Sequence, residues 1–113
     1  MKYKVVLVPF PFDDLSSTKV RPAVCLTEPV GEHKHVVLAF ITSRVFDNPL
    51  STDIILTQND KDFSVTGLRV SSTLQLHRMM TVATSVIVRE LGTLPTSTQK
   101  TVVGKLKLLF GIK

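Results

Sequence analysis

Arg21 is the first of several residues whose type and position could act on an anionic substrate. It follows a polar stretch of the chain and precedes Pro22, where an apolar segment resumes. At such a junction a strand can hold the arginine in place while its planar, permanently charged guanidinium grips a phosphate through two hydrogen bonds. An ion pair between Arg21 and Asp13 or Asp14 explains the same residue equally well.

A second candidate group lies where the apolar run 35–42 ends in Thr42 and is followed by Ser43 and Arg44. Hydroxyls and a guanidinium at the end of a strand reach the rim of a sheet, where they can contact an anion. A strand that merely finishes in polar residues gives the same pattern, and taken alone this simpler interpretation is favoured.

A third candidate, His77, closes a segment in which polar and apolar residues alternate from Leu68 onward. Thr73, Gln75 and His77 share one face of the predicted strand, because side chains alternate with a period of two. We expect that face to show polar groups while the other packs on a core. Histidine is suited to proton transfer near neutral pH, although a surface or hydrogen-bonded histidine is the more common finding.

Other catalytic signatures are absent from the sequence, including GxSxG, HExxH and a glycine-rich phosphate loop. His33 and His35 would share a face of a strand, but no Cys, third His or run of carboxylates completes a zinc site. Cys25 is the only cysteine and lies in an apolar run, so we expect a buried thiol and a reducing compartment. We therefore expect no metal and no other cofactor.

The elements that must position these residues are short β-type runs separated by turn signals. The runs cover residues 3–8, 22–27, 35–42, 53–57, 68–78 and 85–91. Residues 35–42 are apolar almost throughout, which predicts a strand covered on both faces. Since no helical segment intervenes, the spacing indicates a mostly β fold with antiparallel strands in a small barrel or sandwich.

The C-terminal part of the chain changes to a helical period. Thr96 and Gln99 have the spacing of a capping box, and Gly111 is well placed to end a helix. Gly104 inside this helix should cost about 1 kcal/mol relative to alanine. Apolar residues recur at helical spacing and predict a stripe that packs on the barrel, namely Val102, Val103, Leu106, Leu109 and Phe110.

Length and charge limit the classes of protein that the chain can represent. The 113 residues fit a single domain spanning 1–113, and no apolar run approaches the roughly 20 residues that cross a bilayer, so we expect no membrane partner. The net charge is +5, and residues 57–113 hold eight basic and three acidic side chains against six and six in residues 1–56. This balance is compatible with a polyanionic partner.

The segment VLVPFPFDDLSSTKVRPAVCL resembles the first two strands and connecting loop of the MazF/PemK-like toxins of type II toxin–antitoxin systems. AFITS is similar to the family's next strand, TGLRVSS and HRMMTV to a later one, and a C-terminal helix follows in the same order. The resemblance covers essentially the whole chain, and the first segment is its most specific part.

The resemblance implies an SH3-like barrel of the CcdB/Kid/MazF type with a C-terminal helix. It also implies a homodimer that cuts single-stranded RNA without a metal and is bound by an acidic antitoxin in the cytoplasm. Arg21 and Thr42 then carry a reaction in which the ribose 2′-hydroxyl attacks the adjacent phosphate and leaves a cyclic phosphate and a 5′-hydroxyl. This chemistry needs a cation on the developing charge and a donor to a phosphate oxygen. The expected RNA-binding residues are Ser43, Arg44, Arg69, Gln75 and Arg78.

His77 departs from the family pattern, because many members carry there an acidic residue thought to act as a general base. The histidine either takes over that catalytic role or marks altered activity. Two alternatives therefore stay open. One is a non-catalytic toxin on the same fold that binds a protein, as the gyrase-poisoning toxins do. The other is a degenerate member that binds only nucleic acid or its antitoxin.

Overall fold

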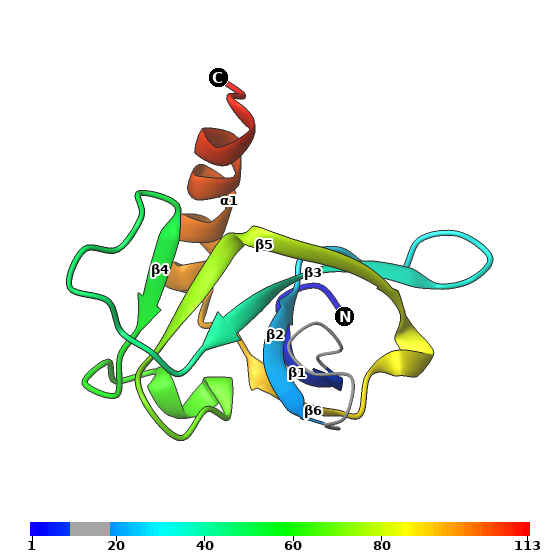
Figure 1. Ribbon diagram of the computed structural model, residues 1–113, viewed down its shortest axis with the longest axis horizontal. Coiled ribbons are helices and arrows are strands. Elements are labelled where there is room, and N and C mark those ends of the chain that lie inside the picture. Colours follow the sequence, from blue (N-terminus) through cyan, green and yellow to red (C-terminus); the bar gives the residue numbers. More distant parts are fainter. Residues whose placement is uncertain (10–18) are drawn as a thin grey trace.

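The computed structural model describes residues 1–9 and 19–113 and is built around one six-stranded sheet. The strands are β1 (Lys4–Pro9), β2 (Val20–Cys25), β3 (His35–Thr42), β4 (Asp53–Leu56), β5 (Ser72–Ala83) and β6 (Arg89–Thr93). They lie in the order β4-β5-β3-β2-β1-β6, and every neighbouring pair is antiparallel. Two 3-10 helices, η1 (Phe63–Thr66) and η2 (Thr84–Val86), and the helix α1 (Thr96–Phe110) complete the described elements. The sheet curls into a half-barrel, and α1 stands beside β4 and β5 (Figure 1).

Apolar side chains are buried on both faces of this sheet. On the face that α1 reaches, which we call the helix face, Ile41 and Leu74 belong to one cluster with Val102. On the opposite face, Leu38 and Phe40 belong to a second cluster. β3 supplies residues to both clusters because its side chains alternate between the faces, which confirms the prediction of a strand covered on both sides.

β5 starts later than the sequence predicted. It begins at Ser72 rather than at Leu68, because hydrogen bonds to Thr66 of η1 and to the loop after β4 hold the preceding residues out of the ladder. The Leu68 amide donates to Thr66 Oγ1 at 3.1 Å, and the Gln58 amide donates to Ser71 Oγ at 2.8 Å. The segment before β5 is therefore a fixed loop instead of the start of a strand.

The predicted polar face of β5 is only partly exposed. Thr73 is fully buried, and its hydroxyl donates to the Arg44 carbonyl at 2.7 Å, so a hydrogen bond compensates the burial. Further along, the pairing with β3 shifts between Ala39 and Phe40, which leaves residues 76–78 in a bulge. The bulge changes the local direction of β5 next to His77.

The last strand is also displaced from its predicted place at 85–91. Residues 84–86 form η2, closed by a hydrogen bond from the Ile87 amide to the Thr84 carbonyl at 3.1 Å. Pairing with β1 then follows, and Gly92 lies inside β6 opposite Val5, beyond the predicted end of the run at residue 91. The turn chemistry of η2 overrides the apolar run that had predicted a strand there.

The C-terminal helix is confirmed, but its predicted capping box is wrong. Because the helix begins at Thr96 itself, no hydroxyl stands in the position before it, and Gln99 Nε2 instead donates to the Leu94 carbonyl at 2.8 Å. Gly111 ends the helix in the left-handed conformation with φ 68°, as predicted.

The apolar stripe of α1 is covered only in part. Val102 is fully buried, whereas Val103 and Phe110 are 44% and 60% exposed. Leu108 and Ile112 are also more than half exposed. Among the described residues, no helix is long and apolar enough to cross a membrane.

Candidate functional site

A pocket of about 290 Å³ opens where β2 begins and β3 ends. Its described lining comes from β1, β2, β6, the end of β3 with Ser43 after it, and the loop before β5 with Ser72 at the start of that strand. The apolar walls include Leu7 and Leu91. We call it the arginine pocket, because Arg21, Arg69 and Arg89 all contribute to its lining. None of the described lining residues is acidic, so the charge that these residues bring is positive.

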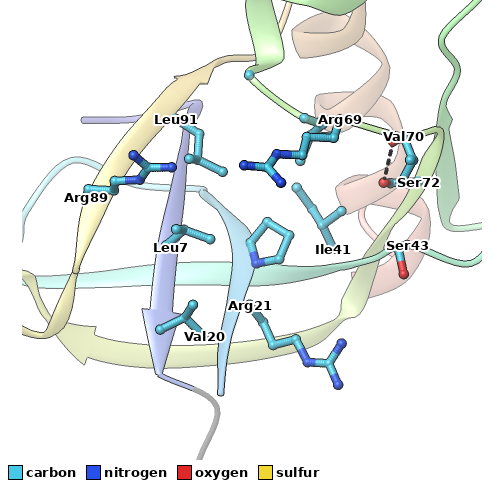
Figure 2. Close-up of a pocket in the computed structure, with 13 residues that line it drawn as sticks. Leu7, Val20, Arg21, Ile41, Ser43, Arg69, Val70, Ser72, Arg89 and Leu91 are labelled. Carbon is cyan, nitrogen blue, oxygen red and sulfur yellow. Dashed lines mark hydrogen bonds between the residues drawn. The ribbon is translucent and has the colours of Figure 1, made fainter. Parts of the chain in front are cut away.

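The strand register distributes these arginines between the two faces of the sheet. Arg89 pairs with Leu7 on β1 and therefore shares the helix face, whereas Arg21 pairs with Val8, whose side chain belongs to the opposite face. Figure 2 shows the guanidinium groups of Arg69 and Arg89 extending toward each other near Leu91, and that of Arg21 pointing away from them. The side chains of Arg69 and Arg89 therefore extend across the pocket, and Arg21 lines its edge.

Two glycines fix the loop that carries Arg69 against β6. A Cβ atom on Gly67 would lie 2.1 Å from the Leu91 carbonyl oxygen, and one on Gly92 would lie 2.2 Å from that of Val65. Gly67 also has φ +73°, a conformation that side chains disfavour. Only glycine at both positions lets the two backbones approach this closely, and Arg69 follows two residues later.

Hydrogen bonds then anchor the backbone of this loop. Gln58 Nε2 donates to the Arg69 carbonyl at 3.0 Å, and Ser72 Oγ donates to the Val70 carbonyl at 2.8 Å, as drawn in Figure 2. The backbone on both sides of Arg69 is thus held in place. The side chain of Arg69 is exposed, so it can change conformation while its backbone stays fixed.

Arg21 and Thr42 occupy the ends of neighbouring strands, as the sequence predicted. Arg21 is the second residue of β2 and Thr42 the last of β3, and both are half-buried. The pairing of these strands reaches Ala23 and Phe40, and the same register continued by two residues places Arg21 opposite Thr42. Thr42 Oγ1 accepts a hydrogen bond from the Arg44 amide at 3.4 Å, which uses a lone pair and leaves the hydroxyl hydrogen to donate.

Gln75 and Arg78 form a polar group on the same face as Thr42. Gln75 pairs with Phe40, and Arg78 Nη1 donates to Gln75 Oε1 at 3.3 Å. The Arg78 guanidinium lies 5.9 Å from the centroid of the Phe40 ring, within the range of a cation–π contact. His77 is exposed in the bulge between them in sequence and is not among the described residues that line the pocket.

The structure divides the predicted site residues into two sets. Arg21, Ser43 and Arg69 line the arginine pocket, whereas the others do not, namely Thr42, Arg44, Gln75, His77 and Arg78. Arg44 turns instead to Phe46, with its guanidinium 5.0 Å from the ring centroid. The alternative partners of Arg21 named from the sequence, Asp13 and Asp14, lie outside the described residues.

Arg89 lines the pocket but was missed by the sequence reasoning. Its run was assigned to a strand, yet nothing in the order of residues indicates which face of that strand meets β1. Within residues 1–9 and 19–113, no group of three or more His, Cys, Asp or Glu side chains is placed to hold a metal ion.

Solved structures of toxins and of toxin–antitoxin complexes share this fold. Toxin MazF-mt6 of Mycobacterium tuberculosis is 20% identical, with a TM-score of 0.74 over 97% of this chain and 98% of that one. An endoribonuclease in complex with its cognate antitoxin from Mycobacterial species is 12% identical, with a TM-score of 0.72 over 100% and 96%. The MazE–MazF structure from Deinococcus radiodurans is 19% identical, with a TM-score of 0.69 over 99% and 95%.

These likenesses confirm the predicted fold class, which is mostly β with antiparallel strands curled into a half-barrel and a C-terminal helix. No curated protein sequence matches the chain. The family described as PemK-like, MazF-like toxin of type II toxin–antitoxin system matches residues 1–110. The chain therefore belongs to the PemK/MazF-like toxin family.

Proposed function

We propose that the chain is a metal-independent, sequence-selective endoribonuclease that cuts single-stranded RNA as the toxin of a type II system. The observation that carries the proposal is the placement of Arg21 and Thr42 at the ends of adjacent strands, beside a pocket that two further arginines overhang. Membership of the toxin family makes RNA the substrate class to test first.

The proposed reaction is transfer of a phosphate ester within the RNA. The ribose 2′-oxygen forms a bond to the adjacent phosphorus, the bond from phosphorus to the 5′-oxygen breaks, and that oxygen takes up a proton. The products are a 2′,3′-cyclic phosphate and a 5′-hydroxyl. DNA lacks the attacking hydroxyl, so the enzyme would distinguish RNA by its chemistry.

Each of the three proposed catalytic residues has a separate task. The Arg21 guanidinium balances the charge that develops on the phosphate oxygens in the transition state. The Thr42 hydroxyl donates to one of those oxygens and orients the phosphate. His77, exposed on β5 and so within reach of a polymer, moves the proton of the attacking hydroxyl.

RNA on either side of the cleaved bond would follow the basic surface. On the face of Thr42, the linked pair Gln75 and Arg78 offers donors to phosphates, and Arg44 extends from the loop after β3. Ser43 and Arg69 offer further donors on the pocket side. The net charge of +5 attracts the polyanion at long range.

We propose a cognate antitoxin and a second copy of the chain as protein partners. Two of the similar solved structures are complexes of a toxin with its antitoxin, and an acidic antitoxin segment would complement the basic surface described above. The uncovered apolar side chains of α1, among them Val103 and Phe110, are the type of surface that a homodimer covers. We place the protein in the cytoplasm, where its RNA substrate occurs.

The test is cleavage of a long single-stranded RNA by the purified protein in EDTA. We expect cleavage with 5′-hydroxyl ends, and a loss of at least about 100-fold in rate for Arg21→Ala and Thr42→Ala, as for other transition-state donors. Lys100→Ala, which removes one exposed charge on α1, should cleave like the parent protein.

Two other results would identify the alternatives. RNA that stays intact while gyrase is inhibited would show a protein-binding toxin, and RNA that is bound but uncut would show a degenerate member. For His77, the informative variant is His77→Asp. An unchanged rate and an unchanged pH profile would remove the proton-transfer role from this residue.

A further inference from the structure

Most of the arginine pocket lies on the face of the sheet opposite Thr42, and of the proposed catalytic residues only Arg21 lines it, at its edge. The strand ends themselves divide the two, since Arg21 and Thr42 belong to the face of Val8 and Phe40, while Leu7 and Ile41 turn to the pocket. Figure 2 shows the Arg21 guanidinium leaving the pocket region and those of Arg69 and Arg89 entering it. The proposed bond cleavage uses only the edge of the pocket, so the residues that line its interior must indicate which group binds there.

The polar side chains in the described lining are three arginines and two serines, and only the two serine hydroxyls can accept a hydrogen bond. Arginine carries five N–H donors and no acceptor, and Arg69 and Arg89 reach in from opposite sides. The Ser72 hydroxyl already donates to the Val70 carbonyl at 2.8 Å, so its hydrogen is used within the protein. No aspartate, glutamate, asparagine or glutamine occurs in the described lining, so the matching ligand must offer acceptors.

The remaining walls are apolar and select against a small, fully hydrated anion. Leu7, Ile41 and Leu91 line the same pocket as the two guanidinium groups (Figure 2). A free phosphate gains nothing from apolar walls and would lose hydration there, whereas the ring of a nucleobase buries apolar surface against them. A volume of about 290 Å³ is at the lower end for ligand pockets and suits one base-sized group.

The nucleobases differ in what they offer to a pocket of donors. Guanine presents two adjacent acceptors, N7 and O6, which match one arginine fork, and this pairing is the most common specific contact of arginine with a base. Adenine pairs an acceptor with a donor on the same edge, cytosine offers a donor, and uracil offers a single carbonyl there. An acceptor between Arg69 and Arg89 would also relieve the repulsion between two like charges that face one another.

We infer that the arginine pocket binds a guanine base of the RNA substrate, at a nucleotide away from the cleaved bond. The inference rests on the proposed function for the identity of the polymer, and on the pocket alone for the identity of the base. It assigns sequence selection to Arg69 and Arg89, and bond cleavage to residues on the opposite face.

The test compares binding of GMP, AMP, CMP and UMP to the intact protein by isothermal titration calorimetry. These nucleotides share one phosphate and differ in the base, so a selective pocket should bind GMP about tenfold to 100-fold more tightly than the others. Arg69→Lys and Arg89→Lys keep the charge but lose the planar fork. Each should abolish the preference for GMP, while Lys100→Ala should keep it.

Equal affinity for all four nucleotides, or a GMP preference that survives both lysine variants, would overturn the inference and assign the pocket to phosphate. Circular dichroism and urea unfolding establish that each variant is folded before it is compared. Nucleotide binding does not depend on cleavage, so the two proposals fail separately. RNA left uncut beside selective GMP binding would refute only the nuclease, and cleavage beside unselective binding would refute only the guanine site.

Discussion

The close backbone contact between η1 and β6 gives the sharpest test of how the fold positions Arg69. Gly67→Ala adds a Cβ atom 2.1 Å from the Leu91 carbonyl oxygen at a φ of +73°. Two costs then act together. A left-handed backbone costs about 1–2 kcal/mol for a residue with a side chain, and forcing an atom into filled space costs about 1–3 kcal/mol. We expect Gly67→Ala to lower the free energy of unfolding by about 2–5 kcal/mol.

Two further glycines separate these costs. Gly31 has φ +77° but nothing within 4 Å of its added Cβ atom, so Gly31→Ala should show the backbone cost alone, about 1–2 kcal/mol. Gly92 has no positive φ, but its Cβ atom would lie 2.2 Å from the Val65 carbonyl oxygen. Gly92→Ala should therefore show the steric cost alone, about 1–3 kcal/mol.

Urea unfolding of the three variants, analysed with a common slope, measures these differences. The double variant Gly67→Ala/Gly92→Ala should lose less than the two single losses combined, because both residues act on the same contact between η1 and β6. If Gly67→Ala costs no more than Gly31→Ala, the contact is not tight in solution. The account of how Arg69 is held over the pocket would then be wrong.

Three other predictions concern the helix, the core and the single thiol. Gly104 lies within α1 with nothing within 4 Å of an added Cβ atom, so Gly104→Ala should raise the free energy of unfolding by about 1 kcal/mol and the Tm by several degrees. Calorimetry without that rise would contradict the helical assignment. Leu38 is fully buried on the face opposite α1, so Leu38→Ala should cost about 2–5 kcal/mol in urea unfolding. Burial raises the pKa of the Cys25 thiol, so the unfolded chain ionises first and stability should fall as the pH rises above the ordinary thiol pKa. A disulfide reagent should react slowly with the native protein at pH 8 and quickly in urea, and equal rates would show that the thiol is not protected.

Where local pattern and tertiary environment agree, the sequence predicted the elements well. The run 35–42 has apolar residues at both odd and even positions, and it forms the strand whose side chains belong to both apolar clusters. The helical period after residue 96 became α1, and Gly111 ended it. Each of these elements has one dominant signal, and no neighbouring contact opposes it.

The predictions failed where a contact outside the strand itself decided the outcome. Thr73 looked like a solvent-facing residue, yet the Arg44 carbonyl accepts from its hydroxyl and allows its burial. Leu68 looked like the start of a strand, but its amide is taken by Thr66. Gly92 follows the predicted run 85–91, yet it lies inside β6, where its missing side chain admits the η1 backbone. The partners of Thr73 and Gly92 are far away along the chain, so no local pattern indicates them.

Some residues of the candidate site could be predicted from the sequence, and others could not. Arg21 and Thr42 could be named because they stand at junctions between polar and apolar residues, and such junctions become strand ends. Arg89 could not be named, because its position over the pocket depends on its pairing with Leu7 across the sheet. The sequence of a strand does not indicate which of its two faces will line a pocket, so a basic residue there cannot be assigned to the pocket in advance.

The division of the site between two faces follows from the period of a strand. Along β3 and the residue after it, Ile41 and Ser43 line the arginine pocket while Thr42 between them does not. On β2, Pro22 shares the face of Leu7, whereas Arg21 takes the opposite face and lines only the edge of the pocket. A step of one residue therefore moves a side chain from the proposed cleavage centre to the proposed base pocket. An RNA strand that crosses the ends of β2 and β3 would meet both, so cleavage and selection need no separate domain and can be altered by different residues of the same two strands.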